Sequence, residues 1–320
     1  MANGVLILAE VANGAVAPVT AELVGAAQRL GAGPVSAMVI GSGVEGGAGG
    51  VLGVEKTYVV DDAALAQYTT DGYVAAAAGV AAKADPAIIL LAQSDAGRDL
   101  GPALACRLGT AIAMDAVALE YKDGKLHTTR PAYGGNALAV NSFTTEPAIA
   151  TVRPKALEAL EGGSAGAVEK VAVDLSGIRT KVLSRDVATA EGVRLEDANV
   201  VVSGGRGLGG PDGFETIEEL ARALGGAVGC SRAVADLGWR PVAEQVGLTG
   251  KVVSPDLYIA VAISGASQHM AGCSGSKNII AINKDADANI FKSARFGIVA
   301  DFKTVMKPLI EAIKKEKAAG

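Results

Sequence analysis

The sequence has few aromatic residues and few cysteines, and each scarcity limits the cores or the metal sites that the chain can form. Aromatic residues make up 4% of the chain, so its cores must be built from alanine, valine, isoleucine and leucine. The three cysteines, Cys106, Cys230 and Cys273, lie far apart and form no C-x-x-C pair, which is typical of free thiols in a reducing compartment. Three cysteines also exclude a self-contained cysteine-ligated iron–sulfur cluster, which normally needs four.

Long apolar runs and a basic surface are missing as well. No apolar run approaches the ~18 residues that a membrane-spanning helix needs. The N-terminus lacks the charged and apolar regions of a secretion signal. The formal net charge is −5, whereas nucleic-acid-binding proteins usually carry a basic face. We therefore expect no membrane insertion, no nucleic-acid partner, and a cytoplasmic (bacterial) or matrix-type soluble compartment.

What the chain has in excess is glycine. There are 42 glycines in 320 residues, nearly twice the usual frequency of about 7%. They follow no collagen-like period, so they must serve turns and close approaches of the backbone. Half of the residues are hydrophobic and 20% are charged, as in a folded globular protein, and the length suggests two domains.

Strand and helix patterns alternate over the first part of the chain. Residues 111–153 are expected to form short strands with turns at 123–124 and 134–136, and residues 171–187 one or two more strands. The polar stretch 188–198 predicts the boundary between an N-terminal α/β domain, 1–190, and a second domain, 191–320. The earlier order predicts a parallel sheet covered by helices, with strands at 5–9, 35–40, 56–60 and 87–92 and helices at 18–30, 73–83 and 99–108.

The second domain repeats the same alternation. Its helices are predicted at 214–224 and 302–315. Its strands are predicted at 199–203, 227–230, 258–263, 279–283 and 297–300. The fold class is therefore α/β, with two α/β domains and a Rossmann-like parallel sheet in the second.

A glycine-rich turn follows the first strand of this domain. Gly205, Gly207 and Gly210 satisfy the pattern G-x-G-x-x-G between a strand and a helix. Glycines let backbone N–H groups approach a phosphate, the helix N-terminus adds positive potential, and Arg206 adds a full charge. The alternative is a turn that only packs the helix on the strand.

The second strand argues against simple NAD binding. Domains that bind NAD usually carry a carboxylate at the end of this strand, to hold the ribose. Here residues 227–230 are followed by Ser231 and Arg232. Arg232 could hold a phosphate or an electron-rich ring, which leaves an NADP-binding transhydrogenase-like protein as one alternative.

His269 ends the segment 264–269, which directly follows a strand. A metal-ligand role lacks neighbouring ligands, and a hydrolase role lacks the G-x-S-x-G turn. A donor to a bound cofactor and a purely structural histidine remain. Segments 245–250, 282–285 and 300–301 offer similar short polar groups. Because ligands bind at the carboxyl ends of such strands, these loops together indicate one large ligand.

An ordered series of segments resembles the alpha subunit of electron transfer flavoproteins. The resemblance covers residues 199–315 through VVSGGRGL, GCSR, QVGLTGKVVSPDLYIAVAISGASQH, KNIIAINKDADANIF and FGIVAD. The N-terminal part matches only in its α/β layout and opening strand. Cys230, Leu248 and Phe302 depart from the usual alanine, glutamine and leucine, but none of these changes removes a charge.

The resemblance implies an FAD cofactor across the second domain. It implies that Arg232 lies over the isoalloxazine near N5 and that Thr249 bonds near N5 or the adjacent carbonyl. It also implies that Gln268 and His269 approach the ribityl chain and the C2 carbonyl, so that Arg232, Thr249 and His269 tune the flavin. Contacts with FAD are implied at Arg206, Ser231, Arg232, Gln245, Val246, Gly247, Leu248, Thr249, Ser264, Gly265, Ala266, Ser267, Gln268, His269, Asn283, Asp301 and Phe302.

The resemblance also implies partners. Family members are heterodimers with a beta subunit, on which the N-terminal domain would pack. They carry electrons from flavin dehydrogenases, such as the acyl-CoA dehydrogenases of fatty acid beta-oxidation, to a quinone oxidoreductase, with no substrate chemistry of their own. Some members instead use NADH and a second flavin to bifurcate electrons. A colourless AMP-binding subunit and a hydrolase using His269 are further alternatives.

Overall fold

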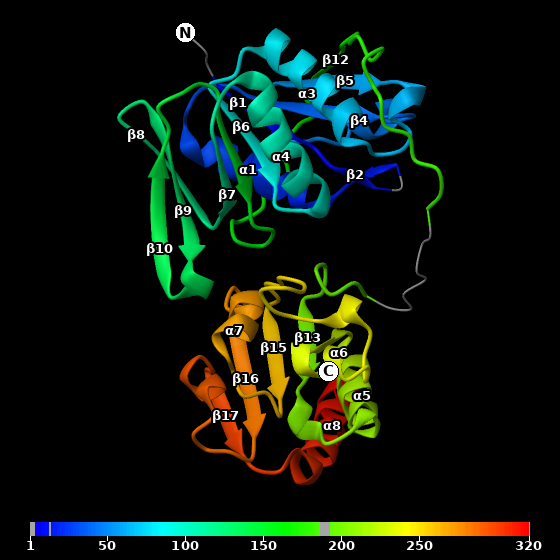
Figure 1. Ribbon diagram of the computed structural model, residues 1–320, viewed down its shortest axis with the longest axis vertical. Coiled ribbons are helices and arrows are strands. Elements are labelled where there is room, and N and C mark those ends of the chain that lie inside the picture. The colour runs from blue at the N-terminus through cyan, green and yellow to red at the C-terminus, as the bar shows by residue number, and fades with distance from the viewer. Residues whose placement is uncertain (1–3, 13, 186–192, 320) are drawn as a thin grey trace. The chain divides into compact units, whose positions relative to one another are not determined.

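The chain folds into two compact units (Figure 1). The computed structural model describes residues 4–12, 14–185 and 193–319. Unit 1 comprises Met1–Ala132 and Leu138–Asp186, and unit 2 comprises Tyr133–Ala137 and Val187–Gly320. The boundary predicted between residues 190 and 191 lies outside the described residues and stays a prediction.

Unit 1 is built on a seven-stranded sheet in the order β12-β5-β4-β1-β6-β11-β7. Every neighbouring pair in this sheet is parallel. β6 is buried along its whole length, as expected for a strand covered on both faces. The strands are β1 (Val5–Leu8), β4 (Val35–Gly41), β5 (Lys56–Asp61), β6 (Ile88–Ala92), β7 (Ile112–Ala116), β11 (Ala148–Val152) and β12 (Ala167–Lys170).

Helices cover both faces of this sheet. α1 (Pro18–Leu30) packs Leu23 and Val24 into one apolar cluster, and α3 (Thr70–Ala84) and α4 (Asp95–Leu108) pack into another. The predicted helices are confirmed. α4 begins four residues before the expected 99 because the Ser94 hydroxyl caps it, accepting from the Gly97 N–H at 3.1 Å.

Shorter elements complete unit 1. The short helix α2 (Glu45–Ala48) follows β4. An antiparallel pair, β2 (Val11–Ala12) and β3 (Ala15–Val16), follows β1. β8 (Ala118–Lys122), β9 (Lys125–Ala132) and β10 (Ala137–Ser142) form a three-stranded sheet in the order β10-β9-β8. The turns predicted at 123–124 and 134–136 are confirmed, since Asp123 and Gly124 both have positive φ and the 3-10 turn η2 (Tyr133–Gly135) separates β9 from β10.

The expectation of strands at 171–187 is wrong for its described part. The strand is β12, at 167–170, where it pairs with β5 and where Glu169 bonds to Lys56 and Lys83. Residues 171–185 run on without helix or strand, and 186–187 lie outside the described residues. The apolar residues of this stretch that fed the prediction, such as Val171 and Val173, instead pack against the α3–α4 side of the core.

Unit 2 is built on five parallel strands in the order β14-β13-β15-β16-β17. In chain order, the second strand, β14, lies at the edge of the sheet beside the first strand, β13. The third strand, β15, lies on the other side of β13. The winding therefore reverses between β13 and β15, which makes a topological switch point. The strands are β13 (Val200–Gly204), β14 (Ala227–Cys230), β15 (Leu257–Val261), β16 (Asn278–Asn283) and β17 (Phe296–Val299), which confirms the predicted ones within two residues.

Two apolar clusters cover the faces of this second sheet. α5 (Phe214–Leu224), α6 (Arg232–Asp236) and α8 (Phe302–Ala319) pack on one face, where Trp239 also lies. α7 (Ser267–Cys273) and the loop residues Val246 and Val253 pack on the other. Unit 2 is thus a doubly wound α/β fold. Its 3-10 turns are η3 (Arg206–Leu208), η4 (Pro211–Gly213), η5 (Val242–Glu244) and η6 (Asn289–Lys292).

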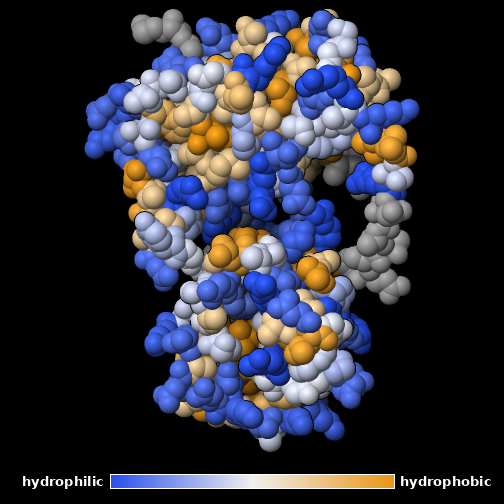
Figure 2. Space-filling model, viewed as in Figure 1, coloured by the Kyte–Doolittle hydropathy of each residue, from blue (hydrophilic) through white to orange (hydrophobic). Residues whose placement is uncertain are grey.

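The outer surface is polar over most of the face that Figure 2 shows, with apolar side chains in small groups between charged ones. Within the described residues, no helix is both long enough and apolar enough to cross a membrane.

Candidate cofactor site

The loops after β13 and β15 meet at the switch point. The Gly205 N–H donates to the Val261 carbonyl at 2.9 Å, and the Gly207 N–H lies 3.4 Å from the Ala262 carbonyl. A Cβ on Gly205 would stand 2.1 Å from the Ala262 carbonyl oxygen, far inside contact distance. Glycine is therefore required at Gly205 so that the two loop backbones can touch.

The loop after β15 is held in an uncommon conformation. Ala262 has φ 55°, in the left-handed region that alanine rarely adopts, and Gly265 has φ 80°. A Cβ on Gly265 would lie 2.3 Å from the backbone N of Ile290. Such backbone strain gathers at functional sites, where the surrounding packing holds it in place. Here it lies in the loop between the carboxyl end of β15 and α7.

The glycine-rich turn differs in part from the expected one. The 3-10 turn η3 stands between β13 and the helical segment, so only Gly210 directly precedes the turn η4 that runs into α5. Gly205 and Gly207 pack against the β15 loop rather than against a helix. Gly210 has extended backbone and open space around its Cβ position. Arg206 is exposed beside this turn.

The loop at 245–251 forms hydrogen bonds both with the end of β14 and with α7. The Val246 N–H donates to the Cys230 carbonyl at 2.9 Å, and the Leu248 N–H donates to the Gln268 carbonyl at 2.7 Å. The buried Gln245 amide donates to the Thr249 hydroxyl at 2.9 Å and holds it on the exposed side of the loop. Predicted site residues from two segments, 245–249 and 264–269, are thus brought together beside the end of β14.

Ser231 and Arg232 lie at the start of α6, beside the glycine-rich turn. The Ser231 N–H donates to the Gly204 carbonyl at 3.0 Å. Arg232 faces Asp236 with an Nε–Oδ2 distance of 3.4 Å, and their side chains are 68% and 63% exposed. Such an exposed pair is weak, so the guanidinium can turn to an anionic or electron-rich ligand at little cost.

His269 is a buried polar residue on α7, with 7% of its surface exposed. Its Nε2 lies 2.9 Å from the Tyr258 hydroxyl, whereas its Nδ1 is buried without a hydrogen-bond partner among the described residues. Burial lowers the pKa of His269 to about 4, and the Val246 backbone acts weakly in the other direction. The imidazole is therefore neutral near pH 7.

The sequence reading missed Tyr258 and Ser203, two further buried polar side chains of this region. Tyr258 lies fully buried on β15, and the buried Ser203 hydroxyl has no partner among the described residues. The available signal was a tyrosine in an otherwise apolar strand. Burial raises the pKa of the neighbouring Cys230 and Cys273 thiols to about 12.

The last predicted residues already have partners within the protein. The Asn283 amide donates to the Ile263 carbonyl at 2.9 Å and accepts from the Asp285 N–H at 3.0 Å. Asp301 accepts from the Lys303 N–H at the start of α8. The Phe302 ring is buried in the α8 face of the core, so its side chain is a packing residue. The remaining ones, Ser264, Ala266, Ser267 and Gln268, are exposed along the approach to α7, whereas Gly247 is buried.

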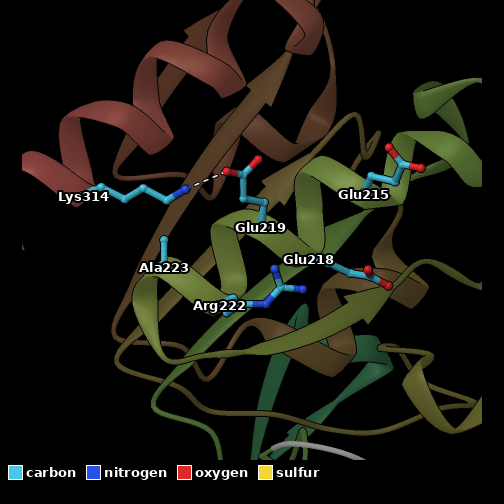
Figure 3. Close-up of a pocket in the computed structure, with 6 residues that line it drawn as sticks. All are labelled: Glu215, Glu218, Glu219, Arg222, Ala223 and Lys314. Atoms are coloured by element: carbon cyan, nitrogen blue, oxygen red, sulfur yellow. Dashed lines mark hydrogen bonds and ion pairs between the residues drawn. The ribbon is translucent and has the colours of Figure 1, made fainter.

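A surface pocket lies elsewhere in unit 2, between α5 and α8 (Figure 3). Lys314 pairs with Glu219 across it at 2.7 Å, while Glu215, Glu218 and Arg222 line the α5 side. It draws no residue from the strand-end loops. The described residues contain no group of three or more side chains that could hold a metal ion.

Comparison with protein families indicates which cofactor unit 2 binds. The electron transfer flavoprotein FAD-binding domain matches residues 194–274, which span the glycine-rich turn, the 245–251 loop and α7. The electron transfer flavoprotein domain matches residues 5–176. The cofactor of this domain is FAD. The site fits it, since Ser264, Ala266, Ser267 and Gln268 are exposed after the carboxyl end of β15, and Nδ1 of His269 is a buried polar atom in need of a partner.

Curated relatives match nearly the whole chain. The electron transfer flavoprotein subunit alpha of Thermoanaerobacterium thermosaccharolyticum is 45% identical over 97% of this chain and 98% of its own. That of Bacillus subtilis is 40% identical over 98% of each chain. Protein FixB of Clostridium saccharobutylicum is 42% identical over 98% of this chain and 97% of its own. The chain therefore belongs to the family of electron transfer flavoprotein alpha subunits.

Proposed function

We propose that this chain is the FAD-holding subunit of a heterodimer that carries electrons from flavin dehydrogenases, such as an acyl-CoA dehydrogenase, to a quinone oxidoreductase. One observation carries the proposal: the FAD-binding family match covers the same loops that the switch point between β13 and β15 brings together. Carboxyl ends of parallel strands at a switch point are where nucleotide cofactors bind in such folds.

Each part of the site has a binding task under this proposal. The exposed cation of Arg206 on the glycine-rich turn would hold the pyrophosphate, since the N–H groups of Gly205 and Gly207 already donate to the loop after β15. The exposed loop from Ser264 to Gln268 would face the ribityl chain. Asn283 and Asp301 would lie at the adenosine end, where the side chain and the carbonyl of each already bond within the protein.

Three residues would set the electrostatics of the bound ring. FAD supplies the redox chemistry when bound, and the protein tunes it by charge and hydrogen bonds. Arg232 offers a full positive charge that its weak pairing with Asp236 leaves available. The Thr249 hydroxyl is positioned by Gln245, and His269 is neutral and so offers a hydrogen bond without a charge. Together they would stabilise negative charge that develops on a neighbouring ring.

The two buried thiols near the site are not arranged as nucleophiles. With their pKa raised to about 12 by burial, Cys230 and Cys273 stay protonated near pH 7 and are poor nucleophiles. All three cysteines are free, which supports a reducing compartment such as the bacterial cytoplasm.

Unit 1 would provide the surface for the beta subunit. The relatives are named as subunits, which supports a second chain. In unit 1, β10 exposes Leu138 and Val140, each with 66% of its surface in solvent. Apolar side chains grouped in this way mark protein interfaces.

The test is an absorbance spectrum of the chain purified with its co-expressed partner, followed by acid release and identification of the cofactor. We expect flavin bands and FAD. One FAD per heterodimer would support a simple electron carrier, and two would favour an NADH-dependent bifurcating protein. A colourless protein that cannot be reconstituted with FAD would overturn the proposal and favour NADP or AMP.

A further inference from the structure

Gln245 is a buried polar residue in the loop that follows η5. Only 5% of its surface is exposed, although glutamine usually lies at protein surfaces. Its backbone is engaged on both sides, since its N–H donates to the Val242 carbonyl at 3.0 Å and its carbonyl accepts from the Lys251 N–H at 2.7 Å. Burial and these bonds leave little of Gln245 free to touch a ligand.

The loop closes tightly around this residue. A Cβ on Gly250 would stand 2.2 Å from the Gln245 carbonyl oxygen and 2.9 Å from its Cγ, so only glycine leaves room there. The next residue along the chain, Val246, is tied by its N–H to the Cys230 carbonyl at the end of β14. Packing and backbone bonds therefore fix the place of the Gln245 amide, as a group that orients another side chain requires.

The amide also gives the Thr249 hydroxyl a direction. Nε2 of Gln245 donates to Oγ1 of Thr249 at 2.9 Å, and Thr249 is itself exposed. A threonine hydroxyl carries one proton and two lone pairs. Because its oxygen accepts from Gln245, its own proton remains for another acceptor. Among the described residues, the Thr249 side chain makes no second hydrogen bond, so that acceptor lies outside this chain.

We propose that Gln245 is a positioning residue that does not touch the cofactor and acts through Thr249. Its amide holds the Thr249 side chain in one rotamer and leaves the hydroxyl proton for an acceptor atom on the ring of the bound cofactor. This role takes the place of the direct contact with FAD that the resemblance implies for Gln245. The rotamer is a property of this chain alone, whereas its effect on the cofactor rests on the proposed function.

The first experiment measures the Thr249 rotamer by NMR in the full chain without FAD. An exposed threonine without a fixed partner averages between staggered rotamers, whereas we expect the three-bond couplings of the Thr249 methyl carbon to report one rotamer. In Gln245→Met, which keeps the length of the side chain and removes the amide, we expect averaged couplings. Gln28→Met is the matched control, because it removes an amide that donates to the Gly53 carbonyl in unit 1.

Two results of this experiment would contradict the proposal. Averaged Thr249 couplings in the wild-type chain would show that nothing holds the side chain. A single, unchanged rotamer in a folded Gln245→Met protein would show that something other than Gln245 holds it. If that variant does not fold, the wild-type couplings still decide whether the Thr249 side chain is held.

The second experiment is a double-mutant cycle on the FAD-loaded heterodimer. We expect Gln245→Met and Thr249→Val each to lower the one-electron reduction potential, because each takes a directed donor away from the ring. The potential of the double variant should equal that of Thr249→Val alone, because Gln245 acts on the cofactor only through Thr249. Gln28→Met should leave the potential unchanged.

The cycle separates positioning from direct contact. Additive shifts would show that Gln245 reaches the cofactor independently of Thr249. A potential raised by Gln245→Met would show that the hydroxyl had given its proton to Gln245. Either result overturns the proposal. If the wild-type heterodimer binds no FAD, the proposed function fails, whereas the hold of Gln245 on Thr249 stands or falls by the NMR couplings.

Discussion

Arg232 is the residue whose charge should matter most for FAD. Its guanidinium is exposed and only weakly paired with Asp236. We expect Arg232→Ala to keep the fold and FAD but to lower the one-electron potential by tens of millivolts, since ~1.4 kcal/mol corresponds to about 60 mV for one electron. Spectroelectrochemical titration measures this. Arg222→Ala, which removes a cation from the α5 surface, is the control. If both variants had the same reduction potential, Arg232 would not be one of the residues that tune the flavin.

Gly205 and Gly210 are two glycines of one turn with opposite steric surroundings. We expect Gly205→Ala to cost about 1–3 kcal/mol of unfolding free energy and to weaken FAD binding, because its Cβ meets the Ala262 carbonyl at 2.1 Å. Gly210→Ala should be close to wild type, since nothing lies within 4 Å of its Cβ position. Urea unfolding and FAD titration of both variants measure the difference, and equal stabilities would contradict the close approach of the two loops.

Burial of His269 makes stability depend on pH. Its pKa is lowered from 6.5 to about 4 in the folded state, so between these values the unfolded chain binds the extra proton. Stability from this group is therefore complete above pH 6.5 and is lost as pH falls toward 4, by roughly 3 kcal/mol at most. Urea unfolding between pH 4 and 7 should show a shallower pH dependence in His269→Gln than in wild type. A slope that His269→Gln leaves unchanged would refute the assignment.

At the scale of elements, one carboxylate of α3 bonds to the segment 171–185, which also packs on the core through Val171 and Val173. Asp71 accepts from the backbone N–H groups of Arg179 and Thr180, at 2.7 and 3.0 Å, and from the Thr180 hydroxyl. These bonds hold the pKa of Asp71 well below its usual range. We expect Asp71→Ala to speed hydrogen exchange of the two amides. Asp62→Ala, which removes only a local cap on Ala64, should leave them slow, and unchanged exchange in Asp71→Ala would show that other contacts hold the segment.

The elements were predictable wherever the sequence pattern matched local structure. Buried runs such as Ile88–Ala92 and the helix between Pro18 and Gly31 could be assigned because periodicity and end signals agree. The prediction of strands in the stretch 171–185 was wrong, because its alternating apolar residues pack on a core without joining a sheet.

The candidate site was predictable in its loops but not in its interior. The loops carry glycines and short polar residues after apolar strands, which are local signals. The Tyr258–His269 pair joins a strand to a helix 11 residues away, and nothing in the sequence shows that the two side chains face each other. The touching backbones at Gly205 and Ala262 likewise depend on strand order, which sequence patterning leaves open.

At the scale of the whole molecule, each unit has its own cores. Leu90 lies in a unit 1 cluster and Leu220 in a unit 2 cluster, and both are fully buried. We expect Leu90→Ala and Leu220→Ala each to cost about 2–5 kcal/mol in its own unit, because each leaves a cavity. Hydrogen exchange followed by mass spectrometry should show lost protection only in the unit that carries the change. Equal loss in both units would show that the chain unfolds as one cooperative body.

The place of Trp239 has an optical consequence. It is the single tryptophan of the chain, and it packs against the α5–α8 face of unit 2. Five of the six tyrosines precede residue 137, and Tyr258 is the sixth. Emission excited in the tryptophan band therefore monitors unit 2 alone, whereas far-ultraviolet circular dichroism averages both units. Denaturation curves from the two signals need not coincide. If they separate, the simplest explanation is that the two units unfold independently, and not that one cooperative unit populates an intermediate.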